Sequence, residues 1–185
     1  MFDNHGGLEN HGGLTIIGCG NPNRSDDGAG VAVVRRLMAR FGGVRAPGVH
    51  LFDAGTNGMQ VMFEARGASE LVLIDASASQ SEPGSIFEVP GDVLQNVPDP
   101  GHGLHGFRWD HAIYAGKKLY GRDFPERVTV YLIEGQTLEL GVGLSDPVER
   151  AVVRVIDLVL ERMNARERSR RAAPMAPLPA EGGQI

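Results

Sequence analysis

The chain has 185 residues, of which 42% are hydrophobic, so it is long enough for one packed domain and too apolar for a disordered protein. Its 23 acidic and 18 basic residues give a net charge of -5, which argues against a general nucleic-acid-binding protein. There is no run of about 18 apolar residues to form a membrane span, no secretory signal, and one cysteine, which excludes an internal disulfide. We therefore expect a cytoplasmic protein with no membrane span.

Apolar β-branched runs alternate with amphipathic helical patterns along the chain. In chain order we expect a strand at 14–19, a helix at 29–41, a strand at 49–53, a helix at 59–65, strands at 70–75 and 85–89, a helix at 109–119, a strand at 128–134, and a helix from Asp146 to about Met163. The strand at 70–75 is apolar almost throughout, which predicts a central position with both faces covered. This alternation predicts an α/β three-layer sandwich, with a mostly parallel twisted sheet of about five strands between helices.

The two ends of the chain do not share this pattern. Residues 1–13 contain most of a repeated Asn-His-Gly-Gly-Leu pentamer, and residues 164–185 are rich in Arg and then in Ala, Pro and Gly. We expect a disordered lead-in at 1–13, one α/β domain at 14–163, and a disordered tail at 164–185.

Carboxylates follow the predicted strands at the points where they end. Asp26 and Asp27 lie in the loop after the first strand, Asp53 and Asp75 end the next two long strands, and Glu134 ends the last. Ligands of such sheets bind beyond the carboxyl ends of the strands, so these side chains are candidates for one shared site. The alternative for each of them is a local role, such as capping a turn or the following helix.

The glycine-rich loop 18–28 invites comparison with a dinucleotide-binding loop. Gly18 and Gly20 match the first two glycines of that motif, but Asn23 stands at the third position. Asp26 and Asp27 would repel a phosphate at the start of the next helix, and no Gly-Lys-Ser/Thr is present. Both observations argue against nucleotide binding.

Two histidines lie on a second glycine-rich loop, just before the predicted helix at 109–119. They are His102 and His105; His111, inside the helix, is expected either to pack or to lie at the surface. Carboxylates together with a neutral imidazole suit a divalent ion such as nickel or zinc. Two carboxylates and one histidine would leave positions open for water or substrate.

Five segments in this order resemble the [NiFe]-hydrogenase maturation proteases, the endopeptidases that trim the hydrogenase large subunit. The segments are Gly18–Gly30, Asp53–Gly58, Leu73–Ala76, Leu104–Phe107 and Leu144–Pro147. The resemblance spans about Leu14 to Met163 and implies an α/β sandwich with a five-stranded sheet. It also implies an enzyme without a catalytic serine or cysteine, in agreement with the position of Cys19 inside the first strand.

The resemblance implies that Asp27, Asp75 and His105 are the metal ligands and the catalytic residues, with Asp26 and Asp53 in positioning roles. The family often has glutamate where Asp27 stands, and often serine before the histidine, where Leu104 stands here. His102 lies three residues before His105, and the choice between these two histidines stays open.

The implied activity is removal of a short C-terminal peptide from the nickel-loaded precursor of the large subunit. The substrate itself carries the nickel. Zinc or cadmium is expected to fit the same ligands. The protein is expected to act as a monomer. The alternative is a metal-binding chaperone that docks on the same subunit without cutting it. A small-molecule α/β hydrolase or a nucleotide-binding enzyme is less favoured, because the chain lacks a nucleophile motif and a phosphate loop.

Overall fold

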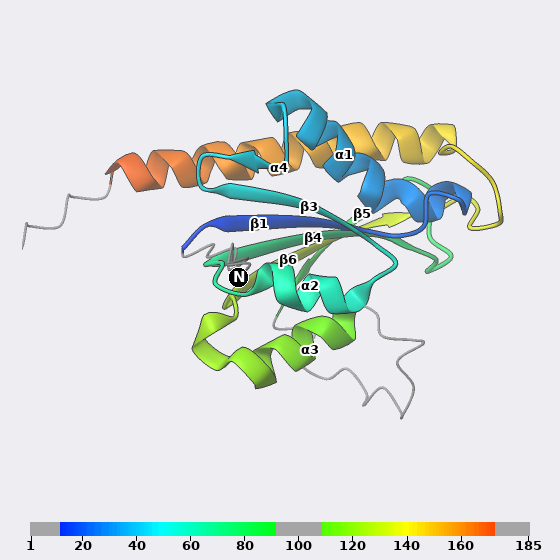
Figure 1. Ribbon diagram of the computed structural model, residues 1–185. Coiled ribbons are helices and arrows are strands. Elements are labelled where there is room, and N and C mark those ends of the chain that lie inside the picture. The colour runs from blue at the N-terminus through cyan, green and yellow to red at the C-terminus, as the bar shows by residue number, and fades with distance from the viewer. Residues whose placement is uncertain (1–11, 92–108, 173–185) are drawn as a thin grey trace, which may run out of the picture.

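The computed structural model describes residues 12–91 and 109–172 (Figure 1). In these ranges the elements are, in chain order, β1 (Leu14–Cys19), the short helix η1 (Ser25–Gly28), α1 (Ala29–Phe41), β2 (Arg45–Ala46), β3 (Val49–Gly55), α2 (Gly58–Ala65), β4 (Glu70–Ser77), β5 (Ile86–Pro90), α3 (Trp109–Tyr120), the short helix η4 (Gly121–Asp123), β6 (Arg127–Glu134) and α4 (Asp146–Ala172). The predicted strands and helices are all present, and most of their bounds agree to within two residues.

The strands form one sheet in the order β2-β3-β1-β4-β6-β5. Strands β3, β1, β4 and β6 are parallel to one another, whereas β5 runs antiparallel to β6 and β2 runs antiparallel to β3. The predicted mostly parallel sheet is therefore confirmed. The additional edge strand, β2, has only two residues, too few to produce a recognisable sequence pattern.

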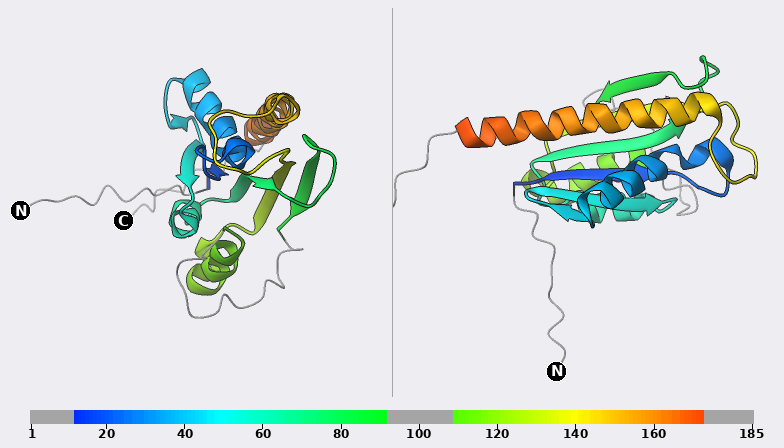
Figure 2. Two further views of the ribbon diagram at one scale, coloured as in Figure 1. Left: turned by 90° about the vertical axis from the view of Figure 1, so that its right-hand side faces the viewer. Right: turned by 90° about the horizontal axis from the view of Figure 1, so that it is seen from above.

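Helices cover both faces of the sheet, with α1 and α4 on one face and α2 and α3 on the other (Figures 1 and 2). Successive side chains of β4 enter the two cores in turn: Val72 and Ile74 pack with α1 and α4, while Leu71 and Leu73 pack with α2 and α3. All four are fully buried. The prediction of a central strand covered on both faces is confirmed, and so is the three-layer architecture.

Helix α1 begins in backbone contact with the sheet, and this contact explains much of the glycine-rich sequence before it. A Cβ atom added to Gly30 would lie 2.2 Å from the carbonyl oxygen of Ile74 and 2.5 Å from that of Cys19. Only glycine permits so close an approach. The glycines therefore serve packing, and they hold η1 above the carboxyl ends of β1 and β4.

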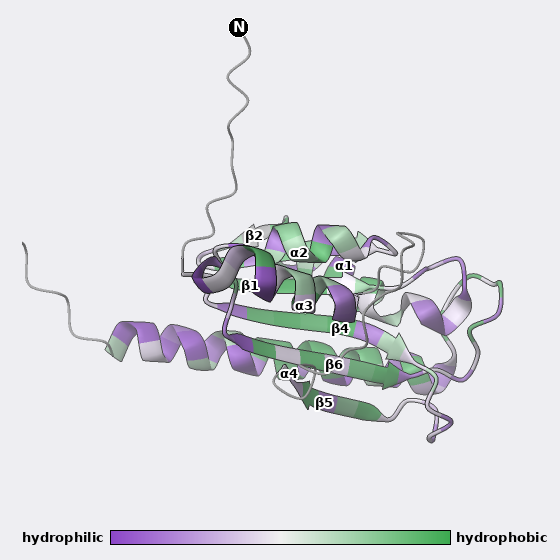
Figure 3. Cartoon of the chain, turned by 90° about the horizontal axis from the view of Figure 1, so that it is seen from below, coloured by the Kyte–Doolittle hydropathy of each residue, from purple (hydrophilic) through white to green (hydrophobic). Residues whose placement is uncertain are grey.

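Helix α4 extends nine residues beyond its predicted end at Met163 and reaches Ala172. Its far end is hydrophilic (Figure 3), but Arg162 and Arg166 turn back to Glu70, at N–O distances of 2.9 and 3.5 Å. Because Glu70 is 8% exposed, these bonds satisfy a buried charge and tie the helix to the sheet. The prediction of disorder from residue 164 is therefore wrong for residues 164–172. Residues 1–11 and 173–185 lie outside the described ranges.

Within those ranges, no helix combines the length and the apolar character needed to cross a membrane.

Candidate functional site

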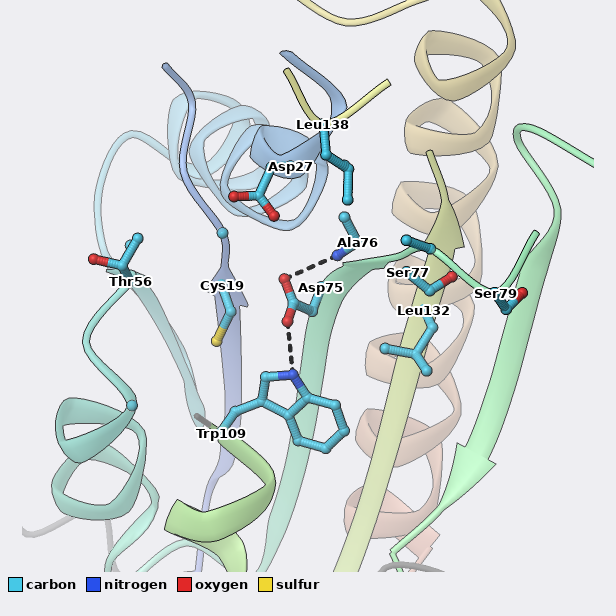
Figure 4. Close-up of a pocket in the computed structure, with 14 residues that line it drawn as sticks. Cys19, Asp27, Thr56, Asp75, Ala76, Ser77, Ser79, Trp109, Leu132 and Leu138 are labelled. Carbon is cyan, nitrogen blue, oxygen red and sulfur yellow. Dashed lines mark hydrogen bonds between the residues drawn. The ribbon is translucent and has the colours of Figure 1, made fainter. Parts of the chain in front are cut away.

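A pocket of about 560 Å³ opens at the carboxyl ends of β1 and β4 (Figure 4). From β1 the chain crosses through α1 to β3 on one side, and then returns through α2 on the opposite face to β4, on the other side of β1. This reversal of direction is the place where α/β sheets bind ligands. The walls come from the ends of β1 and β4, the turn after β3, the first residue of α3 and the loop after β6.

Asp75 lines the pocket from the end of β4, and two donors fix its carboxylate. Oδ1 accepts a hydrogen bond from the backbone N–H of Ala76 at 2.9 Å, and Oδ2 accepts one from the indole Nε1–H of Trp109 at 2.6 Å. Trp109 is 7% exposed, so the indole itself is held by the surrounding core. Hydrogen bonds to a charged acceptor are strong, and this pair sets the direction in which Asp75 faces the pocket.

From the sequence, Trp109 was expected only to begin a helix. It is the chain's one tryptophan and stands directly after the loop that carries the candidate histidines. That position could have identified Trp109 as a hydrogen-bond donor near the site, because a buried indole N–H usually finds an acceptor.

Asp27 reaches the same pocket from η1. Its Oδ2 accepts a hydrogen bond from the backbone N–H of Asn21 at 3.2 Å. Between the two aspartates lies Gly20, at φ +121°, where an added Cβ would stand 1.8 Å from the carbonyl oxygen of Asp27 and 3.5 Å from Asp75 Oδ1. The structure therefore brings together the two carboxylates that the sequence analysis named as ligands.

Asp26 points away from the pocket and is fully buried. Its carboxylate accepts hydrogen bonds from the backbone N–H groups of Gln136 at 2.9 Å, Thr137 at 3.1 Å and Ser145 at 2.7 Å, and from the hydroxyl of Ser145 at 2.9 Å. Asp26 thus anchors the loop between β6 and α4 to η1. This arrangement agrees with the positioning role expected for it.

Asp53 and Glu134 do not line the pocket, contrary to the expectation that every strand-end carboxylate would share one site. Asp53 forms an ion pair with Arg35 at 2.7 Å and accepts the backbone N–H of Gly55 at 3.0 Å. The local alternative is therefore correct for Asp53, whose partner comes from the face of α1.

Glu134 is 1% exposed and anchors the loop that follows β4. It accepts hydrogen bonds from the hydroxyls of Ser77 and Ser79 and from the backbone N–H groups of Ser79 and Ser81. Burial acts to raise the pKa of Glu134, but these hydrogen bonds together lower the pKa below its usual value. The carboxylate is therefore ionised at neutral pH and holds the wall formed by Ser77–Ser79.

Cys19 lies at the end of β1, lines the pocket and is 5% exposed. Burial raises the pKa of its thiol well above the usual value, and the nearby charges of Asp75 and Asp53 raise it further. A protonated thiol is a poor nucleophile at neutral pH. This agrees with an enzyme that does not use cysteine for catalysis.

His102 and His105 lie outside the described residues, so a third ligand stays a prediction. Within 12–91 and 109–172, no group of three or more His, Cys, Asp and Glu side chains is arranged to hold a metal ion. His50 is committed elsewhere, with Nε2 2.8 Å from Glu64 Oε2. What the described residues offer is a pair of oxygen ligands at the end of a pocket, a donor set suited to a divalent cation.

Sequence comparison with known proteins identifies relatives whose names all refer to hydrogenases or their maturation. The family model described as "Hydrogenase maturation protease" matches residues 31–162, a range that includes Asp75 and begins just after Asp27. The hydrogenase 2 maturation protease of Escherichia coli is 25% identical over 153 residues, covering 80% of this chain and 88% of that protein. The coenzyme F420 hydrogenase subunit delta of Methanothermobacter thermautotrophicus is 24% identical over 163 residues, covering 81% and 94%.

Solved structures support the fold. The hydrogenase maturating endopeptidase HybD from Escherichia coli superposes with a TM-score of 0.67 at 21% identity, covering 83% of this chain and 93% of that one. A [NiFe] hydrogenase maturation protease HybD from Thermococcus kodakarensis gives a TM-score of 0.64 at 22% identity, covering 80% and 97%.

Proposed function

The chain belongs to the hydrogenase maturation protease family and is a peptidase, and from this premise we propose that it removes a short C-terminal peptide from the nickel-loaded precursor of a [NiFe]-hydrogenase large subunit. The observation that carries the proposal is the pairing of Asp27 and Asp75 in one pocket at the topological switch of the sheet. The only cysteine beside them is a protonated, buried thiol.

In this proposal the carboxylates of Asp27 and Asp75 bind the nickel ion that the precursor carries, and His105 completes the ligand set. Imidazole nitrogen suits nickel, so the two described carboxylates would need the imidazole of His105 to complete a nickel site. A bound divalent ion supplies a Lewis acid beside the scissile peptide bond. Trp109 and the N–H of Ala76 hold the Asp75 carboxylate in the pocket, so its orientation is set before the substrate arrives.

The alternative function is that of a chaperone, which would bind the large subunit at the same pocket without cleaving it. Family membership favours the peptidase, and the two acids that the resemblance implies as ligands both line the pocket. Incubation with the nickel-loaded precursor decides between the two functions: the peptidase shortens the large subunit, as measured by intact-protein mass, whereas a chaperone leaves its mass unchanged.

Asp27→Asn and Asp75→Asn test the site within that assay. Each removes one charged ligand from a solvent-facing pocket and leaves the core intact, so we expect processing to be lost while thermal unfolding stays close to that of the wild type. Asp157→Asn makes the same chemical change on the exposed face of α4 and should process normally. Normal processing by either pocket variant would contradict the assignment.

The proposal also includes a monomer that acts in the cytoplasm and accepts zinc or cadmium in place of nickel. Sedimentation and calorimetric titration with each metal salt test the first and last of these properties.

A further inference from the structure

The loop between β6 and α4 presents aliphatic side chains to solvent beside the pocket. We call Leu138, Leu140 and Val142 the apolar ridge. Leu138 lines the pocket, whereas Leu140 is 84% exposed and Val142 is 93% exposed. A single exposed leucine needs no explanation, but here three aliphatic side chains alternate along one short segment, one at the pocket that holds the carboxylates and two almost fully exposed.

Polar contacts, and not packing of these side chains, hold the backbone of the ridge. The N–H of Ser25 donates to the carbonyl of Gly141 at 2.9 Å, and the N–H of Gly141 donates to the carbonyl of Asn23 at 3.1 Å. Arg24 Nε donates to the carbonyl of Leu138 at 3.0 Å, and Asp26 anchors both ends of the same loop. The ridge is therefore fixed in place before it meets a partner, which lowers the entropy cost of binding.

The ridge connects two hollows of the surface. On one side, Leu138 shares the pocket with Asp27 and Asp75. On the other side, Val142 lines a groove of about 350 Å³ against α1, together with Val31, Ala32 and Leu144. A polypeptide that enters the pocket from this direction would pass aliphatic side chains in the groove, on the ridge and at the pocket.

The charges beside the groove favour an apolar occupant. Arg35 is paired with Asp53 at 2.7 Å, and Arg36 is paired with Glu149 at 2.8 Å. Both cations that line the groove are thus paired with carboxylates of the same chain. An acidic peptide would have to compete with these carboxylates for the two guanidinium groups, whereas an apolar segment would not.

We propose that the apolar ridge and its groove dock an extended apolar segment of the precursor and so determine which part of that chain reaches the carboxylates. The proposal rests on the proposed function, because it takes the precursor as the polypeptide that enters the pocket. The ridge acts in substrate binding and does not touch the reacting atoms.

The test is the double variant Leu140→Ser with Val142→Ser, assayed on the full-length, nickel-loaded large-subunit precursor. Burying one aliphatic side chain changes an equilibrium constant by about one to two powers of ten, so we expect KM to rise roughly tenfold or more. The rate constant kcat and the thermal midpoint should stay near those of the wild type, since both side chains are exposed. The matched control is Leu119→Ser with Val153→Ser, at positions 66% and 50% exposed on α3 and α4, which should leave KM unchanged.

A binding measurement separates this proposal from the proposed function. Precursor binding is measured by calorimetry on Asp75→Asn, with and without the two ridge substitutions. Cleavage and binding that are both unchanged by the ridge substitutions would overturn the ridge proposal and leave the peptidase intact. Ridge-dependent binding without cleavage by the wild type would overturn the peptidase and support the ridge. Absence of both ridge-dependent binding and cleavage would overturn the docking proposal. So would a ridge variant whose effect in sedimentation is to disrupt self-association.

Discussion

Replacement of Trp109 by phenylalanine should separate the positioning of Asp75 from the packing of the core. Phenylalanine keeps an aromatic ring in the cluster formed with α2 but loses the Nε1–H that lies 2.6 Å from Asp75 Oδ2. A hydrogen bond to a charged group is worth about 1.5–3 kcal/mol. Substitution of groups that orient a metal ligand lowers affinity or activity by about 10- to 100-fold. We therefore expect cleavage of the nickel-loaded precursor to slow by that factor in single-turnover experiments.

The smaller ring also leaves unfilled space, and we expect a loss of about 1–2 kcal/mol in the free energy of unfolding. Ile113→Val is the matched control, because Ile113 lies in the same cluster, is 1% exposed and has no polar side chain to bond Asp75. It should lose about 0.5–1.5 kcal/mol of stability and keep the wild-type cleavage rate. Equal cleavage rates for Trp109→Phe and the wild type, measured well below both unfolding midpoints, would refute the reasoning.

Three further predictions concern the anchors and the third ligand. Asp26→Asn loses acceptor capacity for the buried N–H groups of the loop between β6 and α4. Urea unfolding should therefore show a loss of about 2–4 kcal/mol in the free energy of unfolding. A loss below about 0.5 kcal/mol would show that other contacts hold this loop. Nickel binding to the wild type, measured by calorimetry, should weaken between about pH 7.5 and about pH 5.5. His105→Ala should abolish this binding, whereas His102→Ala should weaken it only modestly. The reverse result would make His102 the ligand. Because the pKa of Glu134 is lowered in the folded protein, its stabilising contribution is present above the unfolded value of about 4.3 and disappears as pH falls through the lowered pKa. The stability difference between the wild type and Glu134→Gln should therefore shrink from about pH 6 to about pH 3, and a constant difference would contradict this explanation.

The sequence was sufficient to predict the fold and two of the carboxylates that line the pocket. Periodicity located the long strands because β4 and its neighbours are covered on both faces and read as continuous apolar runs. The resemblance to the maturation proteases, now confirmed by the family match, selected Asp27 and Asp75 from five candidate acids.

The remaining features depend on partners that lie far away in the sequence. Nothing in the neighbouring sequence shows that Asp75 lines the pocket and that Asp53 does not. The two differ in their distant partners: Arg35 of α1 pairs with Asp53, whereas Trp109 of α3 donates to Asp75. The extension of α4 likewise involves Glu70, which is 96 residues away from Arg166. Its Arg-rich composition was therefore interpreted as that of a disordered tail.

The anchoring of the ridge loop by Asp26 also has a consequence for the order of events during synthesis. Asp26 and Ser145 are 119 positions apart, so the carboxylate is made long before its donors leave the ribosome. Until then it stays in water, because burying an ionised group without hydrogen bonds is strongly unfavourable. Closing so long a loop is also a slow, late step of folding. The loop that carries Leu138 therefore cannot be anchored beside the pocket until nearly the whole domain has been translated.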